Sequence, residues 1–479
     1  MIDKNARRII VQNSTKAITL LIVLTFSLST SKVSADQLPA PVNAESFDKC
    51  TNPTPEHGFE SKKPELLGID GASLDDAIRS GVAKGATSLH VYRNGCLAGS
   101  TDNQILNETP FPLASGTKSV VALAVGRAMG LGFLTINDPL SRYFNDLDED
   151  RRQITIRQLL TQSSGLEFSW GADLFGYLVE PARQALNLPL VEKPGATFAY
   201  GQSTIEILIR IMEISTGQDF LTFVQNELFE PLGIPRDHWV WVKNRMHSPI
   251  GAFGLAMRPS DLGRLGQMML QMGHFSGKEI LSETYIEELS SSSKSNPGYG
   301  FLTWVNSGKD FHTVNMPNSS NLDREVWPGL PKDMYVIVGL FGQIVAVVPS
   351  LNMVITRVGG TTYFDAENPN ASAGAEINPD IRELLWDAVS SAIETDSPDE
   401  ISPIKDMPNP FSSNDLRGFM APDLIMQTVT GVGPSANAHC NLASCNGDTI
   451  LSSSQIWLED ALKQIDAARA STEADLDYR

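Results

Sequence analysis

Ser115 and Lys118 stand three residues apart at the head of a strongly apolar stretch of this 479-residue chain. The stretch runs from Val120 to Met129, is too apolar for a surface helix, and predicts a buried helix that begins near Ser115. Residues three apart share one face of a helix, so the two side chains can meet. Burial and a helix N-terminus both disfavour a charged lysine, and an uncharged lysine can take the proton of a serine hydroxyl. The pair therefore predicts a nucleophile with its own base, although short Ser-x-x-Lys strings also arise by chance.

The helix that begins near Ser115 must be supported by a sheet. Apolar, β-branched segments on both sides of a mostly helical part of the chain predict the strands of that sheet. Residues 86–92 alternate toward an Asn94-Gly95 turn, which indicates a strand, a turn and a second strand. Far along the chain, the runs 334–340, 344–348 and 353–358 are typical of adjacent antiparallel strands. We therefore expect an α+β domain whose sheet joins its two ends.

Helices are expected around and between these strands. The pattern predicts a first helix from Ser73, as its N-cap, to Ala83, and a second over 154–166 that Gly165 stops. A third follows the Tyr200-Gly201-Gln202 turn and ends at Gly217. A fourth, strongly amphipathic, opens at Asn378.

The first 35 residues resemble a secretory signal peptide, with a basic start, an apolar centre and a small-residue cleavage site near Ala35. The apolar run is too short to span a bilayer, which favours export, to the periplasm, over a membrane anchor. Residues 36–64 are rich in Pro, Asn and Glu and are expected to form an exposed leader. No other stretch could cross a membrane, so we expect no membrane span once the signal is removed.

The C-terminal part differs in composition from what precedes it. A linker rich in Pro, Asp, Asn and Ser follows residue 396, and an extension of unknown partner continues to 479. Cys440 and Cys445 are close enough to close a short loop in it, which leaves Cys50 to pair with Cys96 in an exported chain.

Composition excludes several classes of function. The formal charge is −19, and removal of residues 1–35, with five basic residues and one acidic, takes it to −23. Such a chain is poorly suited to nucleic acid or anionic lipid. The seven histidines show no metal-ligand spacing, and neither a dinucleotide loop nor a phosphate loop occurs. We expect no metal and no cofactor. The Gly-x-Ser-x-Gly string of α/β-hydrolases is also missing.

Four motifs occur in an order that resembles the penicillin-recognising serine hydrolases, and more narrowly their class C β-lactamase-related branch. They are Ser115-Gly116-Thr117-Lys118, Tyr200-Gly201-Gln202, the stretch from Tyr299 to Trp304, and Gly339-Leu340-Phe341-Gly342-Gln343 followed by Val347-Val348-Pro349. The last two look most like the 6-aminohexanoate-dimer hydrolases. The resemblance covers about residues 65–395.

The resemblance implies a β-lactamase-like fold, an antiparallel sheet flanked by helices with an all-helical subdomain, here with a small C-terminal extension. Ser115 would attack a carbonyl carbon while Lys118 takes its proton, and Tyr200 would pass a proton to the leaving group. The oxyanion would lie between the N–H groups of Ser115 and Gln343. Gly342 would leave room for substrate.

Two departures from the family pattern bear on the substrate. The usual Tyr-x-Asn reads Tyr200-Gly201-Gln202, so the amide of Gln202 reaches one methylene further. At the expected place of the Lys-Thr-Gly or His-Thr-Gly triplet stands Leu340-Phe341-Gly342. An apolar residue there argues against binding the carboxylate of a β-lactam.

We therefore expect a serine hydrolase that cleaves a small amide or ester through an acyl-enzyme. Two alternatives stay open. One is a β-lactamase or D-alanyl-D-alanine peptidase. The other is a catalytically silent binding protein on the same fold, which the Gln202 departure and the C-terminal extension would suit.

Overall fold

The structure, a computed structural model, divides the chain into two units, Met1–Ser46 and Phe47–Arg479. The described residues all belong to the second unit, and they are 47–314, 319–360, 379–392, 416–445 and 448–449, with 459, 462–464, 466–467 and 470. The signal peptide and cleavage site expected in residues 1–35 therefore lie outside the described residues, as does the linker expected after residue 396.

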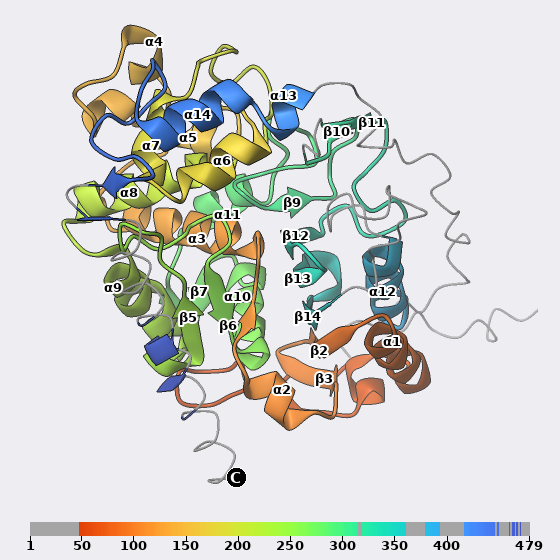
Figure 1. Cartoon of the computed structure of the whole chain (residues 1–479). Helices are drawn as coiled ribbons and strands as arrows, with labels where there is room; N and C mark the ends of the chain where they lie inside the picture. Colours follow the sequence, from red (N-terminus) through yellow and green to blue (C-terminus); the bar gives the residue numbers. More distant parts are fainter. Residues whose placement is uncertain are drawn as a thin grey trace, which may run out of the picture. The chain divides into compact units, whose positions relative to one another are not determined.

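A seven-stranded sheet has the strand order β1-β3-β2-β14-β13-β12-β9 (Figure 1). Its strands are β1 Glu60–Ser61, β2 Ala86–Arg93, β3 Cys96–Ser100, β9 Trp304–Val305, β12 Tyr335–Gly339, β13 Gln343–Val348 and β14 Met353–Gly359. The pairing of β2 with β14 confirms that the sheet joins the two ends of the domain. Every neighbouring pair is antiparallel except β1 with β3, which is parallel. The α+β, β-lactamase-like architecture is thus confirmed, with one parallel pair at an edge.

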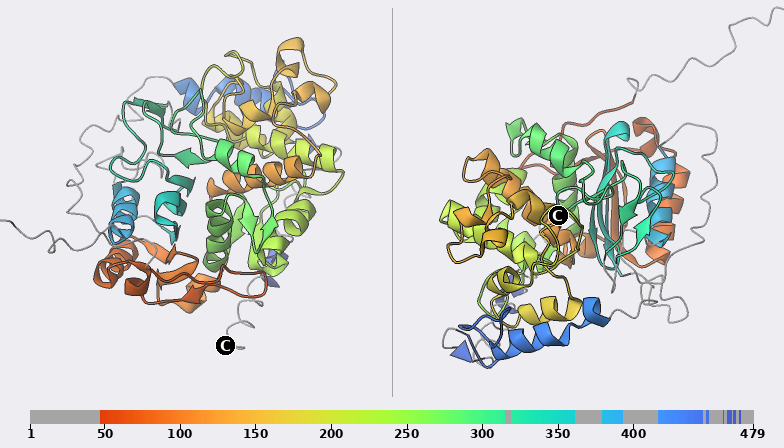
Figure 2. Two further views of the ribbon diagram at one scale, coloured as in Figure 1. Left: turned by 180° about the vertical axis from the view of Figure 1, so that it is seen from behind. Right: turned by 90° about the horizontal axis from the view of Figure 1, so that it is seen from above.

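Helices cover both faces of this sheet. Helices α1 Gly71–Ala83 and α12 Pro379–Ser390 pack together on one face, and α10 Pro259–Leu270 lies across β2, β13 and β14 on the other (Figure 2). Helix α1 begins two residues earlier than expected. Its N-cap is Asp70, whose carboxylate accepts the N–H of Ser73 at 2.8 Å, so Ser73 is the residue being capped.

The chain between residues 116 and 224 forms a helical part, and α3 lies between the rest of this part and the sheet (Figure 1). Its helices are α3 Gly116–Gly130, α4 Glu149–Arg152, α5 Ile156–Leu160, α6 Trp170–Gly176, α7 Pro181–Asn187, α8 Thr204–Thr216 and α9 Phe220–Val224. The buried helix expected at Ser115 and the one stopped by Gly217 are confirmed. The helix expected over 154–166 is wrong in extent, because a capping box at Thr155 starts it and Gln162 takes a left-handed φ of 53°.

A second, three-stranded sheet has the order β4-β6-β5. Its strands are β4 Phe111–Pro112, β5 Trp239–Trp241 and β6 Leu255–Met257. Strand β4 leads directly into Ser115, and β6 follows Ala252. Pairing of β4 with β6 therefore brings together two segments that lie about 140 residues apart in the sequence.

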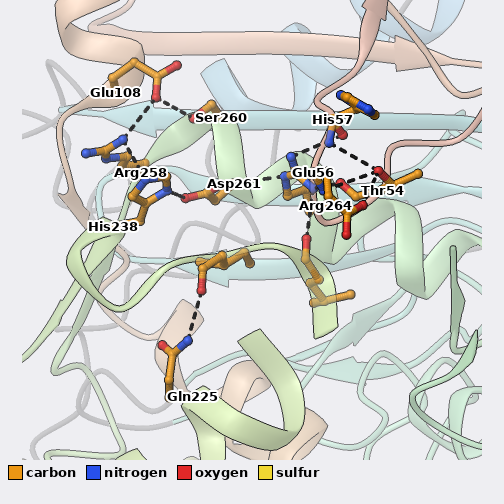
Figure 3. Close-up of polar contacts among 12 residues, drawn as sticks. Thr54, Glu56, His57, Glu108, Gln225, His238, Arg258, Ser260, Asp261 and Arg264 are labelled. Atoms are coloured by element: carbon orange, nitrogen blue, oxygen red, sulfur yellow. Dashed lines mark hydrogen bonds and ion pairs between the residues drawn. The ribbon is translucent and has the colours of Figure 1, made fainter. Parts of the chain in front are cut away.

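The segment before α1 is fastened to the rest of the domain by covalent and polar contacts. A disulfide joins Cys50 to Cys96, as expected. Arg264 of α10 donates to the carbonyl oxygen of Thr54 at 2.6 Å (Figure 3). In the same cluster Asp261 contacts Nδ1 of His238 at 2.8 Å. These polar groups are partnered within the cluster, which fixes the segment against α10.

The C-terminal extension packs on the helical part. Helices α13 Leu416–Phe419 and α14 Pro422–Thr430 lie against α6, and Figure 2 shows them along that side of the domain. Arg417 pairs with Glu167 at 2.5 Å. The second expected disulfide, Cys440–Cys445, is also present. Within the described part of the chain, the helices are all too short or too polar to cross a bilayer.

Two glycines of α3 provide a test of how tightly the helix is packed. A Cβ on Gly126 would overlap the ring of Tyr285, whereas a Cβ on Gly130 would meet nothing within 4 Å. Gly126→Ala should lower the free energy of unfolding by about 1–3 kcal/mol through overpacking. Gly130→Ala, its control, should leave that free energy unchanged or raise it by up to about 1 kcal/mol. Urea denaturation of both variants checks this, and equal effects would contradict the packing of α3 described above.

Candidate active site

A strained turn presents Ser115 at the start of α3. Ala114, the residue before it, has a left-handed φ of 47°, a conformation that L-residues seldom adopt. The turn is held because the Leu113 N–H donates to the Leu255 carbonyl at 2.8 Å, and the Gly116 N–H donates back to the Leu113 carbonyl at 2.9 Å. Ser115 itself is half-buried. Pairing of β4 with β6 thus fixes the position of its hydroxyl.

The Lys118 amine lies beside that hydroxyl, with Nζ 3.1 Å from Ser115 Oγ. The side chain is 1% exposed, and Nζ also contacts Gln202 Oε1 at 2.7 Å and the Ala252 carbonyl oxygen at 2.9 Å. Burial lowers the pKa of Lys118 from 10.5 to about 7, against the opposing pull of the carboxylates of Glu206 and Asp173.

These three contacts decide what the amine can do. A charged amine would donate one hydrogen to each of the three oxygens. An uncharged amine has two hydrogens and a lone pair. Since the Gln202 and Ala252 oxygens can only accept, they take the two hydrogens, and the lone pair then points at Ser115 Oγ. The arrangement therefore suits Lys118 to receive the serine proton.

Tyr200 lies next to the same amine. Lys118 Nζ is 4.9 Å from the centroid of the Tyr200 ring, and the ring is buried. Tyr299 and Trp304 pack against it at centroid distances of 6.2 and 6.4 Å. The motif from Tyr299 to Trp304 thus helps to position Tyr200. The structure brings Ser115, Lys118 and Tyr200 together.

Gln202 joins this group through its side chain, and a buried carboxylate holds its backbone. Its N–H donates to Asp173 Oδ2 at 2.6 Å, and the Ser203 hydroxyl donates to Asp173 Oδ1 at 2.6 Å. Gln202 is 3% exposed, and its Nε2 has no hydrogen-bond partner among the described residues. Gln202 therefore binds Lys118 with its oxygen and keeps an amide N–H₂ for another acceptor.

A second buried carboxylate stands behind Ala252. Glu206 Oε1 accepts the N–H of Gly251 at 2.8 Å and that of Ala252 at 3.3 Å, and it accepts the Tyr177 hydroxyl at 3.0 Å. Burial raises the pKa of Glu206, whereas its hydrogen bonds to Tyr177, Gly251 and Ala252 and the charge of Lys118 lower it, so this carboxyl and the Lys118 amine compete for one proton. Each of the two neutral acceptors of Lys118 is thus fixed by a carboxylate, Asp173 for Gln202 and Glu206 for Ala252.

Gly342 and Gln343 contact α12 and β14, respectively. The Gln343 amide accepts the Gly359 N–H at 3.0 Å and donates to the Gly359 carbonyl at 2.7 Å, so it joins two strands. A Cβ on Gly342 would lie 2.5 Å from Ile381 of α12. Leu340 to Gly342 form the turn between β12 and β13. Their correspondence to the Lys-Thr-Gly triplet stays a prediction from the resemblance.

The stretch of β12 before this turn runs beside Ser115. A Cβ on Gly116 would lie 3.2 Å from Ile337 Cγ2, and one on Gly339 would overlap the Leu113 carbonyl oxygen. Just before β12, the Met334 carbonyl accepts the N–H of Asn306, the residue that follows β9. At the end of β12, the Gly339 carbonyl accepts the N–H of Gly342, in the turn toward β13. Peptide groups of a strand alternate sides, so the Val338 N–H faces the β9 side. Among the described residues the pairing of β9 with β12 ends at Tyr335 and Val336, so β9 does not pair with Val338.

Sequence reasoning missed Asp173, Glu206, Ala252 and Val338. The two carboxylates carried a signal, because each interrupts an otherwise apolar helical stretch. Ala252 and Val338 offer only main-chain groups, which leave no trace in residue type. No cluster of His, Cys, Asp and Glu in the described part of the chain could hold a metal ion.

Comparisons with known proteins find relatives over parts of this chain. An uncharacterised protein of Alkalihalophilus pseudofirmus is 24% identical over 276 residues, which cover 53% of this chain and 74% of that protein. Esterase EstB of Burkholderia gladioli is 30% identical over 212 residues, but these span 36% of this chain and about half, 54%, of the esterase.

Among solved structures, a putative β-lactamase from Bacteroides dorei superposes with a TM-score of 0.53 at 19% identity, over 67% of this chain and 99% of that one. The family model described as Beta-lactamase matches residues 74–375. This match spans α3, the Tyr200 turn and every strand of the seven-stranded sheet except β1. The chain therefore belongs to the Beta-lactamase family.

Proposed function

We propose that the protein is a serine hydrolase that cleaves small esters or amides through an acyl-enzyme. The observation that carries the proposal is the buried Lys118 amine, 3.1 Å from Ser115 Oγ, with two other acceptors that turn its lone pair toward that oxygen. Similarity to an esterase supports the choice of substrate class. A silent binding protein would have no need to bury an amine in this way.

The reaction runs in two halves. Ser115 Oγ forms a bond to the substrate carbonyl carbon while its proton passes to Lys118 Nζ. Collapse of the tetrahedral intermediate breaks the bond to the alcohol or amine, which leaves with a proton delivered through Tyr200. Water then attacks the acyl-enzyme, its proton returns through the same groups, and the carboxylic acid departs from a regenerated Ser115.

Two main-chain N–H groups are suited to hold the oxyanion. Ser115 supplies one. The contacts of β12 favour Val338, in place of Gln343, as the second donor, because residues 337–339 run beside residues 113–116. Gln202 Nε2, which has no partner among the described residues, would donate a hydrogen bond to a substrate carbonyl oxygen.

The surroundings favour an apolar ester over a β-lactam. Val336, Ile337 and Val338 stand on the strand beside Ser115, so no cation is supplied there for a carboxylate. Phe253, next to Ala252, is 37% exposed and offers an apolar contact.

We also propose that the protein is exported to the periplasm, a compartment in which disulfides such as Cys50–Cys96 persist. The proposed boundaries between signal peptide, leader, hydrolase domain and C-terminal extension lie near residues 35, 64 and 395.

Labelling with a fluorophosphonate tests the nucleophile and its base together. Ser115 Oγ should displace fluoride and form one stoichiometric adduct, seen by intact-protein mass spectrometry and absent in Ser115→Ala. Because the pKa of Lys118 is about 7, the labelling rate should rise through neutral pH and then level off. Lys118→Met should slow labelling by about 10²–10⁴-fold. A folded wild-type protein that gives no adduct would refute the proposal that the protein is a serine hydrolase.

A substrate panel separates the candidate activities. We expect turnover of short-chain p-nitrophenyl esters that Ser115→Ala abolishes, with little or no turnover of nitrocefin. Cleavage of nitrocefin at a rate matching that of the esters would instead favour the β-lactamase alternative.

A further inference from the structure

We propose that Glu206 is a positioning residue for the Ser115–Lys118 pair. It holds the carbonyl that orients the lysine and places a carboxylate behind that amine. The inference rests on the proposed function and names a group that the mechanism above does not use. The carboxylate in question is that of Glu206, which is buried on α8 and contacts Gly251 and Ala252 in the segment before β6.

The geometric step is a short chain of hydrogen bonds. Lys118 Nζ donates to the Ala252 carbonyl at 2.9 Å, and the N–H groups of Gly251 and Ala252 both donate to Glu206 Oε1. One oxygen atom thus holds two successive peptides. Without it, the Ala252 carbonyl would be free to rotate away from the amine, and two buried N–H groups would lose their acceptor.

The electrostatic step concerns the other charged and titratable groups that face this amine. Asp173 of α6 contacts the Gln202 N–H, and its negative charge also favours a protonated Lys118. Tyr177 donates its hydroxyl to Glu206 and thereby favours the ionised carboxylate. The Tyr200 ring lies against the amine from the turn before α8. Among these charged groups, Glu206 contributes most to raising the pKa of Lys118. Its loss should therefore lower that pKa.

The substitution Glu206→Gln separates charge from shape. Gln keeps an oxygen for Gly251, Ala252 and Tyr177, and its nitrogen replaces Oε2, which has no hydrogen-bond partner among the described residues. The matched control is Glu213→Gln on the same helix, whose carboxylate pairs with Arg210 at 3.1 Å on the surface.

The experiment follows the rate of fluorophosphonate labelling at Ser115 between pH 5.5 and 9.5 for each variant. Glu206→Gln should move the midpoint of the rise to lower pH, because a neutral amide cannot stabilise the protonated amine of Lys118 as the ionised form of Glu206 does. Glu213→Gln should keep the wild-type midpoint. A merely structural role for Glu206 would lower the rate at every pH and leave the midpoint in place, and that result would overturn the inference.

A second variant guards against misfolding of Glu206→Gln. Tyr177→Phe removes a hydrogen bond that stabilises ionised Glu206, so it should move the midpoint in the same direction by a smaller amount. An unchanged midpoint in a folded Tyr177→Phe, with Glu206→Gln unfolded, would count against the proposal. Failure of the wild-type protein to label would refute the proposed function itself, which is a different outcome.

Discussion

The site depends on one constraint, which is that the Lys118 amine is buried between the Ser115 hydroxyl and two oxygens, of Gln202 and Ala252, that can only accept hydrogen bonds. Loss of water disfavours its charge and lowers its pKa to about 7, while the carboxylates of Glu206 and Asp173 act in the opposite direction. The balance of these opposing effects leaves the amine able to take up and release a proton near neutral pH.

The fold meets this constraint by bringing together segments that are distant in sequence. Strand β4 delivers Ser115, β6 fixes the segment with Ala252, and the turn before α8 delivers Tyr200 and Gln202. Helix α6 brings Asp173 to that turn, and α13 and α14 of the C-terminal extension pack on α6. The extension therefore supports a helix that belongs to the site, which gives it a structural role within this chain.

The sequence allowed the main elements to be predicted where periodicity and local signals agree. The apolar run after Ser115 and the β-branched runs after residue 334 correspond to α3, β12, β13 and β14. Prediction failed where a local hydrogen bond decided the outcome. Asp70 caps α1 in place of Ser73, and a left-handed residue ends α5 early.

The candidate site divides in the same way. Side chains that carry their own chemistry, such as Ser115, Lys118 and Tyr200, could be found from type and order. The Ala252 carbonyl and the Val338 N–H could not, since any residue supplies those groups. Gln343 illustrates the difficulty, because its position at the start of β13, an interior strand, depends on where the turn between β12 and β13 falls, and sequence alone could not determine that register.

The most direct test of the central claim is an NMR titration of the Lys118 amine in protein labelled with ¹⁵N at lysine Nζ. Comparison with Lys118→Met identifies the signal. The account predicts that this amine loses its proton at a pKa of about 7, far below the other lysines. An amine that stays protonated to a pH of about 10, the ordinary value for lysine, would contradict it.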